Sequence, residues 1–533
     1  MKKILFVLMA MIAFFSCGAS DGSTSSNPNE KVLTYNAVAE GISFDPQILT
    51  DGNTMTIHGL VSEGLTYTMP SGEVKPALAE SWEISEDGLT WTFKLRDGIK
   101  WSNGEAITAD DFVFGWQRAL DPKNATEYAY ILFPIKNAEK YASGEVAFEE
   151  VGIKAIDEKT LEVKLENVTP YFDSLVSFIT YMPANRKFAE EKGADYGLEA
   201  DTLLYSGPYK VVKWDHNTQL ELERNEHYYA PESRKIDRYV IKYIADSTAA
   251  LNAFNNGEID IVSITTEQLQ EYKDDARLKI NGLARTFYLA FNLENEIFKN
   301  QKIREAISLA VDKEGLIETV FNGAKEASYT FTPKNIGMLG VKEDFVKELG
   351  PTFAKFDAEK AKVLFEEGKK ELGITDFLTI TFLADERGSN KKIVEKIQED
   401  LRVNLGIELN VEIVTFKERL NRTTARGFDI VLTGWGADYQ DPMTFLDLLI
   451  SKSGNNAPHY YSSEYDALIS AALKTTNREE RMKNLFEAER LLAKDVPIIP
   501  LYQETQLHLV NEAVKGLEIG SFGIDLHFFN VDK

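Results

Sequence analysis

The chain is poor in the residues that build most catalytic and metal centres. Cys17 is the single cysteine in 533 residues, so internal disulfides are excluded. The six histidines are scattered, and neither H-E-x-x-H nor C-x-x-C occurs. G-x-S-x-G occurs at 18–22, but no predicted strand precedes it, so the context of a nucleophile elbow is missing. P-loop and dinucleotide fingerprints are absent too. We therefore predict no enzyme activity, no metal and no cofactor.

Basic residues are also scarce relative to acidic ones. The chain has 59 Lys and Arg against 84 Asp and Glu, which gives a net charge of −25. Such a surface repels phosphate backbones, so we predict no nucleic-acid partner. A chain of 533 residues is too long for one core and indicates two or three domains.

Long hydrophobic runs are confined to the first residues. A basic start at 1–3 precedes a 12-residue apolar run at 4–15, which is typical of a secretory signal and too short to span a membrane stably. Residues 14–17, Phe-Phe-Ser-Cys, resemble the lipobox of bacterial lipoproteins, although Leu is usual where Phe14 stands. We expect Cys17 to be lipidated; a chance cysteine beside an ordinary cleavage site is the alternative. Residues 18–30 are rich in Ser, Gly and Asn and predict a flexible tether.

Alternation of apolar and polar residues predicts strands in the first half and an α/β pattern in the second. Residues 209–214 and 219–224 predict a hairpin, and after about Asn295 long helical patterns alternate with short strands. Further strands are predicted at 287–292, 498–502 and 507–510.

The segment 428–446, FDIVLTGWGADYQDPMTFL, is the most informative one. Its hydrophobicity predicts a buried strand at 428–432, a glycine-rich turn at 434–439 and a helix at 443–450 that begins with Asp441 as N-cap and Pro442 at its first position. Because Asp441 starts the helix, Asp438 has no evident structural role. A carboxylate there could hold a cation such as a peptide's α-ammonium; a solvated turn aspartate is the alternative.

Several segments of the chain resemble those of a known protein family. Six segments, at 78–122, 151–172, 206–229, 255–262, 302–327 and 428–446, are similar to the extracellular solute-binding proteins of ABC importers, family 5. The G-W-x-A-D-Y core at 434–439 is similar to the oligopeptide-binding branch.

The resemblance implies an α/β, two-lobed periplasmic-binding-protein-like (type II) fold with an extra subdomain inserted in the first lobe. It also implies a monomer outside the cytoplasm, in the periplasm or at the cell surface, anchored to the membrane through Cys17, with short peptides and ABC permease subunits as partners. The implied divisions are a signal at 1–17, a tether at 18–30, lobe one at 31–61, 183–285 and 500–533, the inserted subdomain at 62–182 and lobe two at 286–499.

The resemblance further implies a peptide site. Asp438 would pair with the peptide's α-ammonium, the main chain of Gly434 and Gly436 would pair with its backbone, and Trp435 would wall the site. Leu432, Asn390 and Phe416 stand where well-studied relatives carry Arg, His and Trp, so the carboxylate end of the site differs. The remaining implied ligand-binding residues are Thr50, Asp51, Gly52, Tyr128, Tyr439 and Tyr502.

Other functions are compatible with the same sequence. Relatives bind nickel chelates, haem, oligosaccharides or signalling peptides, and a sensory or adhesive role would use the same lobe closure. A secreted hydrolase is a further alternative, against which the missing nucleophile and metal motifs argue.

Overall fold

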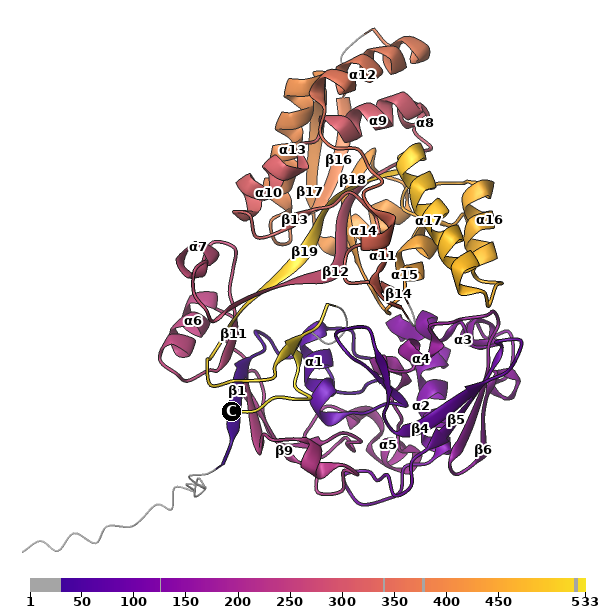
Figure 1. Cartoon of the computed structure of the whole chain (residues 1–533), viewed down its shortest axis with the longest axis vertical. Coiled ribbons are helices and arrows are strands. Elements are labelled where there is room, and N and C mark those ends of the chain that lie inside the picture. Colours follow the sequence, from indigo (N-terminus) through magenta and orange to yellow (C-terminus); the bar gives the residue numbers. More distant parts are fainter. Residues whose placement is uncertain (1–29, 125, 339–340, 376–378, 522–525) are drawn as a thin grey trace, which may run out of the picture.

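The computed structural model describes residues 30–124, 126–338, 341–375, 379–521 and 526–533, and it shows an α/β chain arranged in two lobes (Figure 1). Two long strands, β12 (Leu278–Phe291) and β19 (Ile498–Val510), run from one lobe into the other. They pair antiparallel, with register shifts between Gly282 and Thr286 and between Phe287 and Tyr288. The predicted lobe boundaries at 285 and 500 fall inside these two strands, and the boundaries themselves stay a prediction.

One sheet continues through both lobes. Its strand order is β17-β16-β18-β12-β19-β11-β1-β10-β9-β8, and β13 also pairs with β19. β1 pairs parallel with β10, whereas β12 pairs antiparallel with β18. The remaining strands of this sheet are β1 (Val32–Asn36), β8 (Tyr209–Asp215), β9 (Gln219–Arg224), β10 (Arg238–Lys242), β11 (Ile261–Ser263), β13 (Glu326–Ala327), β16 (Thr379–Asp385), β17 (Glu408–Val414) and β18 (Ile430–Gly436).

Two of these strands are longer than predicted. β12 begins at Leu278, nine residues before the predicted start at Phe287. β19 is one strand, where two were predicted. Its middle, residues 503–506, is Gln-Glu-Thr-Gln, and these polar residues interrupt the hydrophobic run, although Gln503, Thr505 and Gln506 still pair with β12 around a register shift at Glu504.

The lower lobe in Figure 1 contains a separate four-stranded sheet, β4 (Ala79–Ile84), β5 (Thr90–Leu95), β7 (Thr160–Lys164) and β6 (Ile153–Asp157), in that order. α2 (Ala109–Leu120) packs beside it, and the Asp111 carboxylate accepts a hydrogen bond from the Thr108 N–H at 2.8 Å, as in a capping box. Shorter elements of this lobe are α1 (Gly52–Val61), β2 (Thr66–Thr68), β3 (Val74–Pro76), α3 (Ala138–Ala142), α4 (Phe172–Leu175), α5 (Arg186–Lys192), α6 (Ser247–Asn255), α7 (Leu269–Tyr272), β20 (Glu518–Ile519) and β21 (Leu526–His527).

The upper lobe carries the long helices. α12 is capped by Asp357, which accepts from the Lys360 N–H at 3.0 Å, and α12 packs on α9. The elements of this lobe outside the central sheet are α8 (Glu296–Lys299), α9 (Gln301–Ala310), α10 (Lys313–Phe321), β14 (Gly337–Met338), β15 (Val341–Asp344), α11 (Phe345–Leu349), α12 (Ala358–Leu372), α13 (Asn390–Leu405), α14 (Phe416–Thr424), α15 (Met443–Leu446), α16 (Ser463–Ala472) and α17 (Arg478–Asp495). Within the described parts of the chain, no helix has the length and apolarity needed to cross a bilayer.

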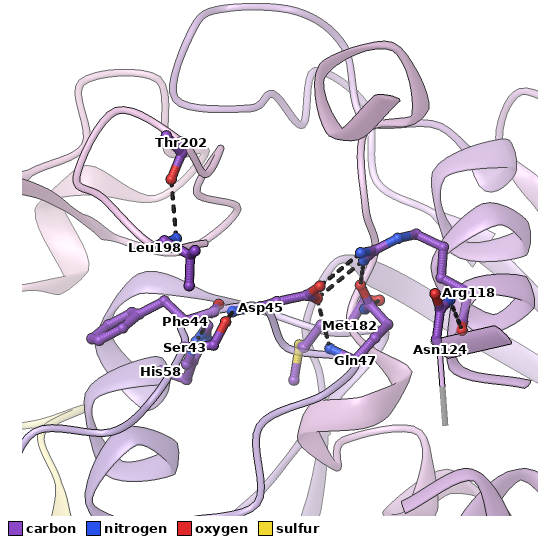
Figure 2. Close-up of polar contacts among 10 residues, drawn as sticks. All are labelled: Ser43, Phe44, Asp45, Gln47, His58, Arg118, Asn124, Met182, Leu198 and Thr202. Carbon is purple, nitrogen blue, oxygen red and sulfur yellow. Dashed lines mark hydrogen bonds and ion pairs between the residues drawn. The ribbon is translucent and has the colours of Figure 1, made fainter. Parts of the chain in front are cut away.

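A buried polar network fixes the loop that enters α1 (Figure 2). Arg118 on α2 forms a two-pronged ion pair with Asp45, with nitrogen–oxygen distances of 3.0 and 2.6 Å, and also donates to Gln47 Oε1 at 2.6 Å. Gln47 in turn donates to the Met182 carbonyl at 3.0 Å. Because both charges of the pair are largely withdrawn from water and paired, the loop has a defined conformation ahead of α1.

Candidate ligand-binding site

A cavity of about 860 Å³ lies between the two lobes. From the lower lobe, the cavity is lined by the start of α1 and the 3-10 helix Glu127–Leu132. From the upper lobe, it is lined by β18, α14 and residues 451–461, and β12 forms the wall that joins the two lobes. The volume falls within the range of roughly 300–1,000 Å³ that is usual for small-ligand sites.

Asp438 occupies one end of this cavity. The Tyr130 hydroxyl, from the lower lobe, donates to Asp438 Oδ2 at 2.9 Å, and the Asp438 N–H donates to Thr444 Oγ1 at 3.1 Å. Burial raises the pKa of Asp438 to about 6, opposed by the Tyr130 hydrogen bond and by the charge of Arg285. A carboxylate that is costly to keep charged in the empty cavity gains from a cationic ligand.

β18 presents an open edge to the cavity. The strand runs to Gly436, so the predicted turn at Gly434 is wrong: Gly434, Trp435 and Gly436 are extended and pair with Phe287, Thr286 and Arg285 of β12. On its other side β18 pairs with β16 through Ile430 and Val431 alone. From Leu432 to Gly436 that side therefore has no strand partner in the described structure, and these residues line the cavity.

The two glycines of β18 make room for side chains of β12. A Cβ added to Gly434 would lie 3.1 Å from the Phe287 ring, and one added to Gly436 would lie 3.0 Å from Arg285 Nε. Larger residues would displace Phe287 and Arg285. The glycines thus allow Arg285 to lie against the strand, with its charge close enough to lower the pKa of Asp438.

The other end of the cavity is basic and aromatic. Asp385, buried at the end of β16, accepts hydrogen bonds from Arg387 Nε at 2.9 Å and from Asn390 Nδ2 at 3.0 Å, and Arg419 Nε lies 3.2 Å from it. The Arg387 guanidinium stacks on the Phe416 ring at 3.4 Å. One carboxylate faces two guanidinium groups here, so this end keeps a net positive charge.

Ten of the predicted ligand-binding residues line the cavity. They are Thr50, Gly52, Tyr128, Asn390, Phe416, Leu432, Gly434, Trp435, Gly436 and Asp438. The indole N–H of Trp435 is buried without a hydrogen-bond partner in the described structure, so the cavity wall holds an unused donor.

Three predicted residues lie elsewhere. Asp51 caps α1 and accepts from the Thr54 N–H at 2.8 Å. Tyr439 is buried and stacks on Tyr171 with ring centroids 4.6 Å apart, and Tyr502 is buried and stacks on Phe287 at 4.9 Å. These rings support the cavity wall from behind.

The helix after Asp438 is shorter than predicted. α15 covers Met443–Leu446, and a 3-10 turn at Asp447–Leu449 follows it. Asp441 accepts from the Met443 N–H at 2.9 Å and forms a buried two-pronged ion pair with Arg481, at 2.8 and 2.7 Å. Pro442 is thus the N-cap of α15, so the predicted cap at Asp441 is displaced by one residue, although Asp441 still accepts from the first N–H of the helix and has an ionic partner on α17.

Sequence patterns missed several cavity residues. Tyr130 and Arg285 meet Asp438 from other elements, and Arg387 and Arg419 form the basic end. The arginines stand in ordinary polar stretches of strand, loop and helix, where no spacing marks them. Cys17 lies outside the described residues, and the described residues hold no group of His, Cys, Asp and Glu that could bind a metal.

Comparison with known proteins places this geometry in a family. Residues 73–457 match the model "Bacterial extracellular solute-binding proteins, family 5 Middle", which is more than half of the chain. The chain belongs to this family. The solute-binding protein is 32% identical to the dipeptide-binding protein DppE of Bacillus subtilis, over 96% of this chain and 94% of the relative.

Solved structures agree with the family assignment. The substrate-binding domain of an oligopeptide ABC transporter from Bacillus anthracis has a TM-score of 0.77 and 36% identity, covering 94% of this chain and 98% of that one. OppA of Listeria monocytogenes bound to peptide has a TM-score of 0.76 and 33% identity, covering 94% and 99%. The predicted family and α/β two-lobed fold are confirmed, and the solute-binding protein is a receptor rather than an enzyme.

Proposed function

We propose that this protein captures short peptides between its two lobes and delivers them to the permease of an ABC importer. We further propose that it acts outside the cytoplasm, as a monomer held at the membrane through lipidated Cys17. The names of its relatives, which describe dipeptide and oligopeptide binding, support the choice of ligand.

The observation that carries the proposal is the position of Asp438 beside the open edge of β18. A peptide that pairs with residues 432–436 as an added strand brings its α-ammonium to the Asp438 carboxylate, where Tyr130 already donates. Main-chain pairing holds any sequence, and the ammonium pair fixes which end of the peptide lies at Asp438.

The basic end of the cavity suits the carboxylate of the same peptide. Leu432 cannot supply a charge, and the Asn390 amide already donates to Asp385. Arg387 and Arg419 line the cavity together with Leu432 and Asn390. Their two guanidinium groups therefore supply the positive charge that Leu432 on β18 does not.

The test is to identify the bound ligand and to remove Asp438. Gently purified protein is denatured, and the released molecules are analysed by mass spectrometry; a mixture of short peptides with varied sequences is the expected result. A single defined small molecule, such as a metal chelate, would instead favour another solute of the family.

Asp438→Asn is expected to lower peptide affinity by about 30- to 5,000-fold, because truncating a buried charge pair typically costs about 2–5 kcal/mol. Asp447→Asn is the matched control, because Asp447 is a half-buried carboxylate nearby whose oxygen accepts from Tyr439 and which does not line the cavity. Isothermal calorimetry measures both. Equal affinities for Asp438→Asn and the native chain would refute the assignment.

A further inference from the structure

A second cavity, of about 70 Å³, adjoins the first at Asp438. Both cavities are lined by Met55, Phe178, Asp438 and Ser521. The rest of the second cavity is formed in the lower lobe by α1, β2, α4, His527 of β21 and the segments that directly follow α1, β2 and α4. A group that extends past Asp438 from the main cavity enters this space.

The lining favours an uncharged apolar occupant. Three of the chain's nine methionines, Met55, Met69 and Met182, line the second cavity together with Phe178 and Ile179. Methionine side chains are flexible and polarizable, and they adapt to small groups of different shape. A charge moved into such surroundings loses its hydration without a matching partner.

Glu63 also lines the second cavity, and one of its two carboxylate oxygens is engaged. Glu63 Oε1 accepts from the hydroxyls of Tyr228 and Tyr229, both at 3.2 Å, and the charges of Arg234 and Arg96 act on it. Burial raises its pKa to about 7. The Oε2 atom of Glu63 is buried without a hydrogen-bond partner in the described structure, so a comparison of free and N-blocked peptides must decide which kind of group enters this space.

The walls of the second cavity are fixed from behind. Figure 2 shows the polar network of the 43–47 loop reaching two lining residues. Gln47 holds the Met182 carbonyl at 3.0 Å, and the His58 Nε2–H donates to the Phe44 carbonyl at 2.9 Å. Burial lowers the pKa of His58 to about 4, so the ring stays neutral. The cavity is preformed, and occupying it requires little rearrangement.

An unused hydroxyl lies where the two cavities meet. Ser521 is 7% exposed, and its Oγ has no hydrogen-bond partner in the described structure. Its main chain is held, because the Ala284 N–H of β12 donates to the Ser521 carbonyl at 2.6 Å. A buried hydroxyl without a partner is uncommon, and a ligand acceptor at this junction would satisfy it.

We propose that the second cavity receives a small acyl cap on the peptide's amino terminus, such as formyl or acetyl. The acyl carbonyl accepts from the Ser521 hydroxyl, the remaining amide N–H donates to the Asp438 carboxylate, and the acyl carbon packs on the methionines. The receptor then takes N-blocked peptides as well as free ones. This inference rests on the proposed peptide function.

The experiment compares trialanine with free, formylated, acetylated and benzoylated amino termini by isothermal calorimetry on the full soluble chain. Formyl- and acetyl-trialanine are expected to bind measurably, up to about 100-fold more weakly than the free peptide, because the N–H···carboxylate bond is retained while the ammonium charge is lost. Benzoyl-trialanine should bind at least 100-fold more weakly than acetyl-trialanine, because an engineered cavity that binds benzene measures about 150 Å³, about twice the volume of the second cavity. Equal binding of all three caps would place the cap in solvent and overturn the inference.

Variants of Ser521 locate the cap. Ser521→Leu, which fills the junction, should weaken acetyl-trialanine at least tenfold more than free trialanine, and Ser521→Ala should do so by about threefold to tenfold. Ser177→Ala is the matched control, since the Ser177 hydroxyl lines the second cavity and is already bonded to Thr68 at 2.7 Å. Thermal unfolding checks that each variant folds.

The outcomes separate the two proposals. If free trialanine binds and the acetylated form does not, the inference on the second cavity fails while the peptide function stands. If Ser521 variants weaken both peptides equally, the cap does not lie at the junction. If neither peptide binds the native chain, while extraction yields another solute, the proposed function fails and the inference fails with it.

Discussion

Asp438 has three neighbours or surroundings that act on its charge. It is half-buried, it accepts from a tyrosine of the opposite lobe, and a guanidinium acts on it from the neighbouring strand. Burial dominates, so its pKa rises to about 6 in the absence of a ligand. Protonation of this residue thus competes with the binding of a cation close to neutral pH.

Peptide affinity should therefore depend on pH through Asp438. A bound ammonium stabilises the charged carboxylate and lowers its pKa, so binding below pH 6 must displace a proton. We expect affinity to be highest near pH 7, to fall by about tenfold per pH unit below 6, and to fall again above about pH 8, where the peptide's own α-ammonium loses its proton. Calorimetry between pH 4.5 and 8 measures the dependence.

The same titration on Asp438→Asn is the control for this dependence. An amide does not titrate in this range, so the variant should bind weakly and with little dependence on pH. A native profile that stays flat down to pH 5, or a variant that keeps the slope, would assign the proton to another group.

At the scale of single elements, the two edges of β18 differ clearly in how much of each is paired. One edge pairs with β12 over seven residues, from Ile430 to Gly436, whereas the other pairs with β16 at two. The strand thus belongs to the sheet and also offers main-chain groups to the cavity. Affinity from main-chain groups explains how one site can hold many peptide sequences.

Main-chain pairing predicts that backbone changes in the ligand matter more than side-chain changes. N-methylation of the second or third residue of a tripeptide removes a donor and adds bulk at the strand edge, so it should lower affinity at least tenfold. Exchanging the side chain at the same position among Ala, Leu and Lys should change affinity by less than about tenfold. Competition against a fluorescent peptide measures both series, and the reverse order of sensitivity would contradict strand addition.

The sequence predicts much of this element and little of its surroundings. The apolar run at 428–432 predicts a buried strand, and Asp438 stands out because Asp441 already has a capping role. The extension of β18 to Gly436 was not predictable from composition, because glycine normally weakens a strand. Here glycine is needed at both positions, because a Cβ would press against the side chains of Phe287 and Arg285 on β12. β12 lies about 150 residues earlier in the chain.

At the scale of the whole molecule, the two lobes share one sheet. β12 and β19 continue across the cavity wall, and their pairing shifts register between Gly282 and Thr286, beside the site. A shift in register loosens the ladder locally while the strands stay paired on both sides. We infer that the lobes change their relative position by bending at this point rather than by separating.

A shared sheet predicts that ligand binding stabilises the chain as one unit. Free ligand at 100 times Kd adds about 2.7 kcal/mol, and about 2.1 cal/mol/K per residue over roughly 500 residues converts this to a rise in Tm of about 2–3 °C. Scanning calorimetry of the native chain with and without a bound peptide tests this. Two separate transitions, of which the ligand moves only one, would show that the lobes unfold independently.

Both ends of the described chain are fastened to the same lobe. Lys31 beside β1 forms an ion pair with Asp532, and Lys533 forms one with Asp260 at 2.8 Å, so the two ends lie next to each other (Figure 1). The upper lobe contains neither end. A dye placed at either end of the described chain would thus be a reference fixed to the lower lobe, and a second dye on the upper lobe would report any movement between the lobes as a change in distance.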